Sequence, residues 1–197
     1  IADGTSDKQI HFIADQPKGT WKGIAFNNSA ADASTNIELS GDGTYVSGSI
    51  IRYAEFVSAV QGITCSGASP FLAFLHTAKG GVRCTPGSTP LWIQDTAMSG
   101  GIYVTQGTLY ARRNVLSGQG LVATGVGHVE DNQITGASIS IGTGEIRKNV
   151  VVDGSLGLGS NTSASQNTVK GGGISAGSNA TIVDNLVEGG GISVGLN

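Results

Sequence analysis

The sequence predicts an all-β fold, a single-stranded parallel β-helix in which the chain winds into stacked coils of about 17 to 20 residues. Glycine accounts for 32 of the 197 residues, which suits a fold with many tight turns. Apolar residues fill the same positions in successive coils. Above all, an asparagine recurs in steps of 18, 17, 18 and 18 residues: Asn114, Asn132, Asn149, Asn167 and Asn185.

The recurring asparagines are interpreted as a structural ladder. Parallel coils of this length stack about 4.8 Å apart, so equivalent positions form columns along the axis. A column of asparagines can hydrogen-bond amide to amide, as in cross-β ladders, and asparagine tolerates tight turns. Glycines follow each ladder residue by four positions, or by five in one coil, and predict a second bend with positive φ: Gly118, Gly136, Gly154, Gly171 and Gly189.

Apolar side chains flank the ladder in two further columns. Three positions before it stand Ala111, Val129, Ile146, Ala164 and Ile182, and two positions after it stand Leu116, Ile134, Val151, Val169 and Val187. A second strand then alternates with period two, from Leu121 and Ala123 to Ile192 and Val194. Such alternation places the apolar side chains on one face, so we expect them to fill the interior of the coil.

We predict one β-helix domain over residues 1–197, with about nine to ten coils. Residues 45–197 form the regular coils, and residues 1–44 form one or two irregular first coils. The segment 27–44 is rich in Ser, Ala, Asp, Asn and Gly, and is expected to be a protruding loop. The chain begins with Ile1 rather than Met, and neither end carries a polar cap. These features predict a segment of a longer chain.

Composition and charge restrict the partners. The net charge is −3 and no basic block occurs, which argues against a nucleic-acid partner. No apolar run approaches the roughly 18 residues of a membrane span. The three histidines, His11, His76 and His128, are far apart and lack ligand spacing, so no metal and no cofactor are expected.

Charged residues also form columns. One and two positions before the ladder, the sign alternates between coils, as in Arg113, Asp131 and Lys148. We expect ion-pair ladders on the outside of a turn, which are structural rather than catalytic and which oppose slippage by one coil.

The two cysteines occupy one inward column. Cys65 and Cys84 are 19 residues apart, in neighbouring coils, where stacked Cα atoms lie within the range of a disulfide. We expect a disulfide if the protein is extracellular, the alternative being two small buried apolar residues.

The repeat Asn-x-[Ile/Leu/Val]-x-Gly, followed by an apolar-x-apolar strand, resembles that of the right-handed parallel β-helix proteins of the pectate-lyase-like superfamily. The opening segments Gly4-Thr5-Ser6-Asp7 and Trp21-Lys22-Gly23-Ile24-Ala25-Phe26 resemble secreted bacterial members. The resemblance implies right-handed winding and an extracellular or cell-surface location. It leaves function open, because this fold hosts lyases, hydrolases, adhesins, phage spikes and surface fibres.

The resemblance also suggests where chemistry would lie. Lyases of the superfamily use Arg or Lys, and Arg83 and Tyr103 face outward in adjacent coils with Lys79 nearby. These three residues are the candidate catalytic group of a polysaccharide lyase. Tyr103 and Trp92 are, alternatively, stacking platforms of a glycan-binding module. The outward residues of the second strand include no acid, so the carboxylate pair of a hydrolase is not predicted.

The preferred functional hypothesis is a non-catalytic, extracellular structural or adhesive β-solenoid, part of a surface fibre or filament. On the last four coils the outward face of the second strand is a flat strip of small residues, including Ser140, Gly157, Ser175 and Ser193. Such a strip allows lateral self-association, and the ends of a stack allow end-to-end association. A carbohydrate-active enzyme and a glycan-binding module, each with a polysaccharide partner, are the alternatives.

Overall fold

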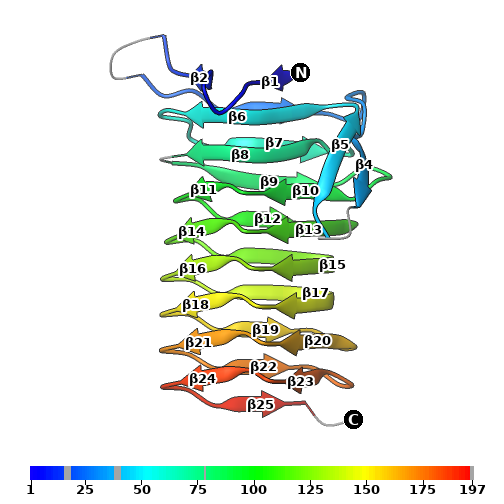
Figure 1. Ribbon diagram of the computed structural model, residues 1–197, viewed down its shortest axis with the longest axis vertical. Coiled ribbons are helices and arrows are strands. Elements are labelled where there is room, and N and C mark those ends of the chain that lie inside the picture. The colour runs from blue at the N-terminus through cyan, green and yellow to red at the C-terminus, as the bar shows by residue number, and fades with distance from the viewer. Residues whose placement is uncertain (16–18, 38–40, 78, 196–197) are drawn as a thin grey trace.

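The computed structural model describes residues 1–15, 19–37, 41–77 and 79–195. It is a parallel β-solenoid of about eight turns, stacked along one axis with the two termini at opposite ends (Figure 1). All strands except β4 and β5 join one continuous 23-stranded sheet. The described residues contain no helix, and therefore none that is long and apolar enough to cross a membrane. The all-β solenoid prediction is confirmed, with about eight turns instead of the nine to ten expected.

The strands form three faces, which we name by a feature of each. The hairpin face contains β1 (Ala2–Asp3), the first halves of β6 (Ile50–Phe56) and β8 (Phe71–Thr77), β10 (Leu91–Gln94), β13 (Thr108–Arg112), the last halves of β15 (Leu121–Glu130) and β17 (Ile139–Arg147), β20 (Thr162–Ser165) and β23 (Thr181–Val183). The ladder face contains β2 (Ile10–Phe12), the second halves of β6 and β8, β11 (Ala97–Met98), β14 (Val115–Ser117), β16 (Gln133–Thr135), β18 (Val150–Val152), β21 (Thr168–Lys170) and β24 (Leu186–Glu188). The serine face contains β3 (Ile24–Phe26), β7 (Gly62–Ser66), β9 (Gly81–Thr85), β12 (Ile102–Val104), the first residues of β15 and β17, β19 (Leu156–Leu158), β22 (Ile174–Ala176) and β25 (Ile192–Val194).

Successive turns lie in register, so the apolar columns of the sequence become columns in space. Ala111 pairs with Val129, Val129 with Ile146, and Ile146 with Ala164. These side chains are fully buried and belong to one continuous core that extends from Ile51 to Ala176. Each turn therefore buries its apolar surface only against its two neighbours, which is the energetic principle of a solenoid.

The asparagine column is a hydrogen-bonded ladder inside the bend between the hairpin and ladder faces. The side-chain oxygen of Asn149 accepts hydrogen bonds from the backbone N–H and from Nδ2 of Asn132, both at 2.9 Å. Nδ2 of Asn132 also donates to the carbonyl of Ala111 at 2.9 Å. The same pattern repeats at Asn114 and Asn167. Asn132 and Asn149 have no exposed surface, so the ladder satisfies polar groups that would otherwise be buried without partners.

The left-handed backbone conformation in this bend belongs to the residue before each asparagine, not to the asparagine itself. Five residues in this position have φ between 51° and 57°: Arg113, Asp131, Lys148, Gln166 and Asp184. One turn earlier Thr96 takes the ladder position, its backbone N–H donating to the side-chain oxygen of Asn114, and Asp95 before it has φ of 54°. This differs from our expectation, and it leaves the asparagines free for their side-chain role. Four positions after the ladder, Gly118, Gly136, Gly171 and Gly189 have positive φ, and Asp153 takes this conformation in the turn where glycine comes one residue later.

The N-terminal part forms a single irregular turn, because β1 and β2 pair with β6 and β3 pairs with β7. The segment expected as a protruding loop contains the antiparallel hairpin of β4 (Ser34–Ile37) and β5 (Gly43–Ser47). This hairpin lies against the outside of the solenoid and crosses several turns (Figure 1). The hairpin buries few side chains of its own and instead covers apolar residues of the hairpin face. Its polar sequence therefore does not predict two strands.

Candidate functional site

Arg83 and Tyr103 are neighbours on the serine face. They are register partners on β9 and β12, and the guanidinium carbon of Arg83 lies 4.5 Å from the centroid of the Tyr103 ring. This is the geometry of a cation–π contact. A groove of about 270 Å³ borders Arg83 and is lined mainly by glycine and glutamine residues: Gln61, Gly80, Gly81, Gly100, Gly101 and Gln119.

The other sequence-predicted site residues do not join this pair. Lys79 is exposed in the turn before β9, and within the described residues it makes no ion pair or hydrogen bond with Arg83 or Tyr103. Trp92 lies on β10, on the hairpin face, and its side chain is 1% exposed. Of the two residues expected as stacking platforms, Trp92 offers no exposed ring face, because the hairpin covers the indole, and it lies on a different face from Tyr103.

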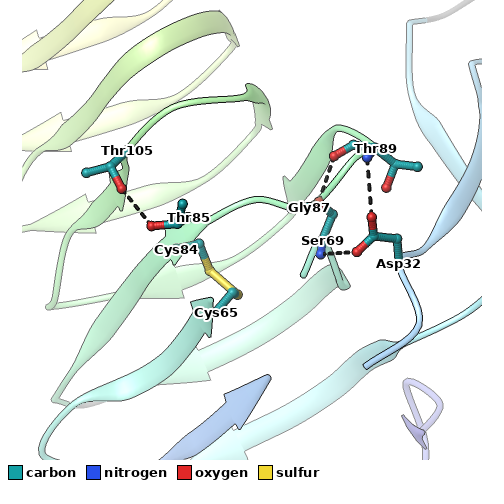
Figure 2. Close-up of a disulfide and its surroundings, with 8 residues drawn as sticks. All are labelled: Asp32, Cys65, Ser69, Cys84, Thr85, Gly87, Thr89 and Thr105. Atoms are coloured by element: carbon teal, nitrogen blue, oxygen red, sulfur yellow. Dashed lines mark hydrogen bonds between the residues drawn. A yellow bond between two sulfur atoms is a disulfide. The ribbon is translucent and has the colours of Figure 1, made fainter. Parts of the chain in front are cut away.

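The base of the hairpin is held by the carboxylate of Asp32. It accepts hydrogen bonds from the backbone N–H groups of Ser69 at 2.8 Å and Thr89 at 3.4 Å (Figure 2), and from that of Ser88 at 2.9 Å. Burial is the largest single influence on the pKa of Asp32 and raises it, but the combined donors outweigh burial and the pKa lies below its ordinary value. The ionised carboxylate thus ties the hairpin to the corners of two turns.

The middle of the hairpin covers an apolar patch on the face below. Ala33, Ile50, Phe71, Ala73 and Trp92 are buried together, separately from the main core. The backbone N–H of Gly43 donates to Oε1 of Gln94 at 3.3 Å. Within the described residues Nε1 of Trp92 has no hydrogen-bond partner, so the indole is held by packing alone.

The tip of the hairpin joins a cluster of ion pairs. Asp42 contacts Arg112 at 2.7 Å and Arg113 at 2.5 Å. Arg113 also pairs with Asp95 at 2.6 Å, and this hydrogen bond is the main cause that raises the pKa of Arg113. One turn further, Glu130 accepts from both Arg112 and Arg147 at 2.9 Å.

These pairs are less exposed than the sequence suggested. Arg112 and Glu130 are each only 6% exposed. The expectation of exposed ladders on the outside of a turn must therefore be corrected for these two residues. Charges at this depth lose solvation, so the cluster contributes mainly to the position of the hairpin and to the register of the turns.

A stack of aromatic rings begins beneath the hairpin and continues along the hairpin face beyond it. The rings of Trp92 and Tyr110 lie 4.1 Å apart and 5° from parallel, and those of Tyr110 and His128 lie 4.6 Å apart and 11° from parallel. Beside the stack is a pocket of about 100 Å³, lined by Ile37, Gly41, Tyr110, Arg112, His128, Glu130, Glu145 and Arg147. We call it the hairpin groove.

The sequence holds a signal for this site that was not among the predicted site residues. Trp92, Tyr110, His128 and Glu145 each stand four residues before the ladder position, so they form one column. Along the chain His128 is far from the other histidines, which hides its place in this column. Alignment of the coils on the ladder would have placed it directly after two aromatic residues.

Cys65 and Cys84 form a disulfide in the interior between β7 and β9 (Figure 2). The bond joins register partners in neighbouring turns, and both cysteines are buried. In the part of the chain that the structure describes, no three His, Cys, Asp or Glu side chains are grouped so that they could hold a metal ion.

Comparisons with known proteins add no assignment: scans of family models, of curated proteins and of solved structures found no match to this chain.

Proposed function

We propose that this chain is a non-catalytic, extracellular structural element, a stiff rod that forms part of a surface fibre or filament. The observation that supports this best is the continuity of the ladder, in which every step from Asn114 to Asn185 is made by hydrogen bonds of 2.8 to 3.0 Å. An unbroken column of this kind resists both bending and sliding between turns, because either motion would leave buried amides without partners.

The disulfide and the ion-pair cluster add to this rigidity at the N-terminal half. The Cys65–Cys84 bond joins two turns covalently, and such bonds persist in oxidising surroundings outside the cell. Asp42 and Glu130 connect further turns through Arg112. Covalent and ionic links between turns suit a protein that must keep its shape outside the cell.

The serine face suits lateral association. Ser140, Gly157 and Ser175 lie side by side as register partners on β17, β19 and β22, and line a shallow groove of about 370 Å³. Small side chains allow a second sheet to approach to about 10 Å. End-to-end stacking of turns is the other arrangement.

Sedimentation velocity and negative-stain electron microscopy over a range of concentrations test the proposal. The wild type should form oligomers or filaments. The double variant Ser140→Lys/Ser175→Lys should remain monomeric if association is lateral, and should form filaments of single width if association is end to end. The matched control Ser163→Lys/Ser165→Lys, on the hairpin face, should behave as wild type. Wild-type protein that remains monomeric at the highest concentration would reject self-association.

A carbohydrate-active function at Arg83 and Tyr103 is the second candidate, favoured by the cation–π pair and by the groove that Arg83 lines. A polysaccharide lyase would produce an unsaturated uronate, which absorbs in the ultraviolet, and Arg83→Ala should abolish this signal, with Lys79→Ala as a second test. Binding of a polysaccharide that needs Tyr103, without product, would indicate a glycan-binding module. Neither product nor binding across acidic and neutral polysaccharides would exclude this candidate.

A further inference from the structure

From the hairpin groove we infer that the chain has a binding site for a neutral saccharide, in which one sugar ring stacks on His128. The site lies on the hairpin face, apart from Arg83 and Tyr103. It depends neither on self-association nor on lyase activity.

The aromatic stack ends at His128, which is partly exposed. Tyr110 covers the other face at 4.6 Å. The next place in the column belongs to Glu145, whose carboxylate lies 3.5 Å from Nε of Arg147. Among the described residues no aromatic ring follows His128 in this column, so the C–H face of a pyranose beside Glu145 can lie against the exposed part of the imidazole.

Polar groups that suit sugar hydroxyls surround this place. The hydroxyl of Tyr110 and both ring nitrogens of His128 make no hydrogen bond with other described residues, although both side chains line the groove. Glu145 and Arg147 have side chains that are 44% and 40% exposed, and they offer an acceptor and donors at the groove. Hydroxyl groups can use both kinds of partner at once.

The charge of the groove favours a neutral ligand. Its lining contains two arginines and two glutamates, Arg112, Arg147, Glu130 and Glu145. Glu130 pairs with both arginines at 2.9 Å, so neither sign is in excess. An anionic or a cationic ligand would have to break these pairs, whereas a neutral one need only accept and donate hydrogen bonds.

The hairpin forms the wall of the site. Ile37, which is 60% exposed, and Gly41 line the groove on this side, and Asp42 holds the hairpin to Arg112. The volume of about 100 Å³ corresponds to roughly three water molecules of liquid, so it admits part of one ring rather than a chain. The remainder of an oligosaccharide would extend along the open face over Ser163 and Thr181, the next register partners in the column.

Saturation-transfer NMR and calorimetry test this site with a stated set of probes: the methyl glycosides of glucose, galactose, mannose and N-acetylglucosamine, the disaccharide cellobiose, and glucuronic acid and glucosamine as charged comparisons. We expect at least one neutral probe to bind. His128→Ala should weaken its binding about tenfold or more, while His128→Phe, which keeps a ring at the end of the stack, should retain most of it. Thr135→Ala, at an exposed residue of β16 on the ladder face, should bind as wild type.

Three results would overturn the inference: no neutral probe binds, only the charged probes bind, or binding survives in His128→Ala but is lost in Tyr103→Ala. Thermal unfolding of each variant shows whether it is folded. Should His128→Ala fail to fold, Glu145→Gln replaces it, and unchanged binding of every neutral probe by that variant would also count against the site. Sedimentation of the same variants separates this result from the proposed structural role, because His128→Ala should leave the oligomeric state unchanged.

Discussion

Gly43 lies directly against the indole of Trp92. A Cβ atom on residue 43 would come within 2.5 Å of Cε3 of Trp92, a distance that side-chain carbons do not adopt. The glycine is therefore required for close approach rather than for an unusual backbone angle. The contact lets the hairpin lie flat over an indole that is 1% exposed, and so determines which aromatic residues of this face reach solvent.

Gly43→Ala should lift the hairpin from the solenoid while leaving the coils intact, because the methyl group collides with a ring that has no space to move. Tryptophan fluorescence should shift to longer wavelength, and quenching by acrylamide should increase. The background variant Trp21→Phe leaves Trp92 as the sole reporter. Thr44→Ala, the next residue in β5, serves as the control. Unchanged fluorescence in Gly43→Ala would show that the hairpin does not depend on this contact.

Acid should release the base of the hairpin at Asp32. The pKa of this carboxyl in the folded protein lies below its ordinary value of 3.8. The stabilisation is therefore present above the unfolded pKa, and is lost as the pH falls through the folded pKa. In the Trp21→Phe background, Trp92 should become exposed as the pH falls below about 4. Asp32→Asn should expose Trp92 more than the wild type does already at neutral pH, and its acid transition should be weaker. An acid transition identical to that of the wild type would rule out Asp32 as its cause.

Asn132→Ala should destabilise the fold by about 2 to 4 kcal/mol, because it removes one buried amide and leaves groups of Asn114 and Asn149 without partners. Urea unfolding gives the change in free energy. Gln133→Ala is the matched control, since Gln133 is the exposed next residue and should change stability by less than about 0.5 kcal/mol. Equal effects of the two substitutions would contradict the structural importance of the ladder.

Gln166 tests the left-handed bend without the complication of charge. It is exposed, has φ of 57° and precedes Asn167. Gln166→Gly should be neutral or stabilising by up to about 1 kcal/mol, while Gln166→Val should destabilise by about 1 to 3 kcal/mol, because a β-branched residue is strained there. Lys170 is an exposed strand residue, so the order of stability should reverse there, and Lys170→Gly should be less stable than Lys170→Val. Chemical denaturation of the four variants compares them.

The disulfide should be present in protein prepared without reductant. Thiol titration of unfolded, unreduced protein should find no free thiol, and reduction should then release both cysteines. Cys65→Ala/Cys84→Ala should lower the free energy of unfolding by about 3 kcal/mol, the value expected for a loop of roughly 20 residues. Two free thiols before reduction would contradict the bond and would remove one argument for an extracellular location.

The coils could be predicted from the sequence because every turn repeats the same physical requirement. A buried asparagine with apolar neighbours at fixed offsets, as around Asn132 and Asn149, can satisfy its amide only when successive turns lie in register. The inward cysteine column followed from the same alignment. The left-handed residue could not be assigned in this way, because Asp131, Lys148 and Gln166 share no chemistry that reveals a positive φ.

The hairpin and its groove were not predictable in the same way. The hairpin does not repeat, and its two short strands are largely polar. Its position depends on contacts between residues far apart in the chain, such as Asp42 with Arg112. Trp92 looked like a surface aromatic because its own sequence neighbours do not cover it. Only the fold brings Gly43 over it and leaves Tyr110 and His128 beside an open groove.

The register of the turns is tested most directly by NMR scalar coupling across a hydrogen bond, between the backbone nitrogen of Asn132 and the side-chain carbonyl carbon of Asn149. The two groups lie 2.9 Å apart from nitrogen to oxygen, so a coupling should be observed, together with slow exchange of the Asn132 amide proton. Absence of the coupling, with rapid exchange of that proton, would contradict the stacking on which the fold, the proposed function and the hairpin groove all depend.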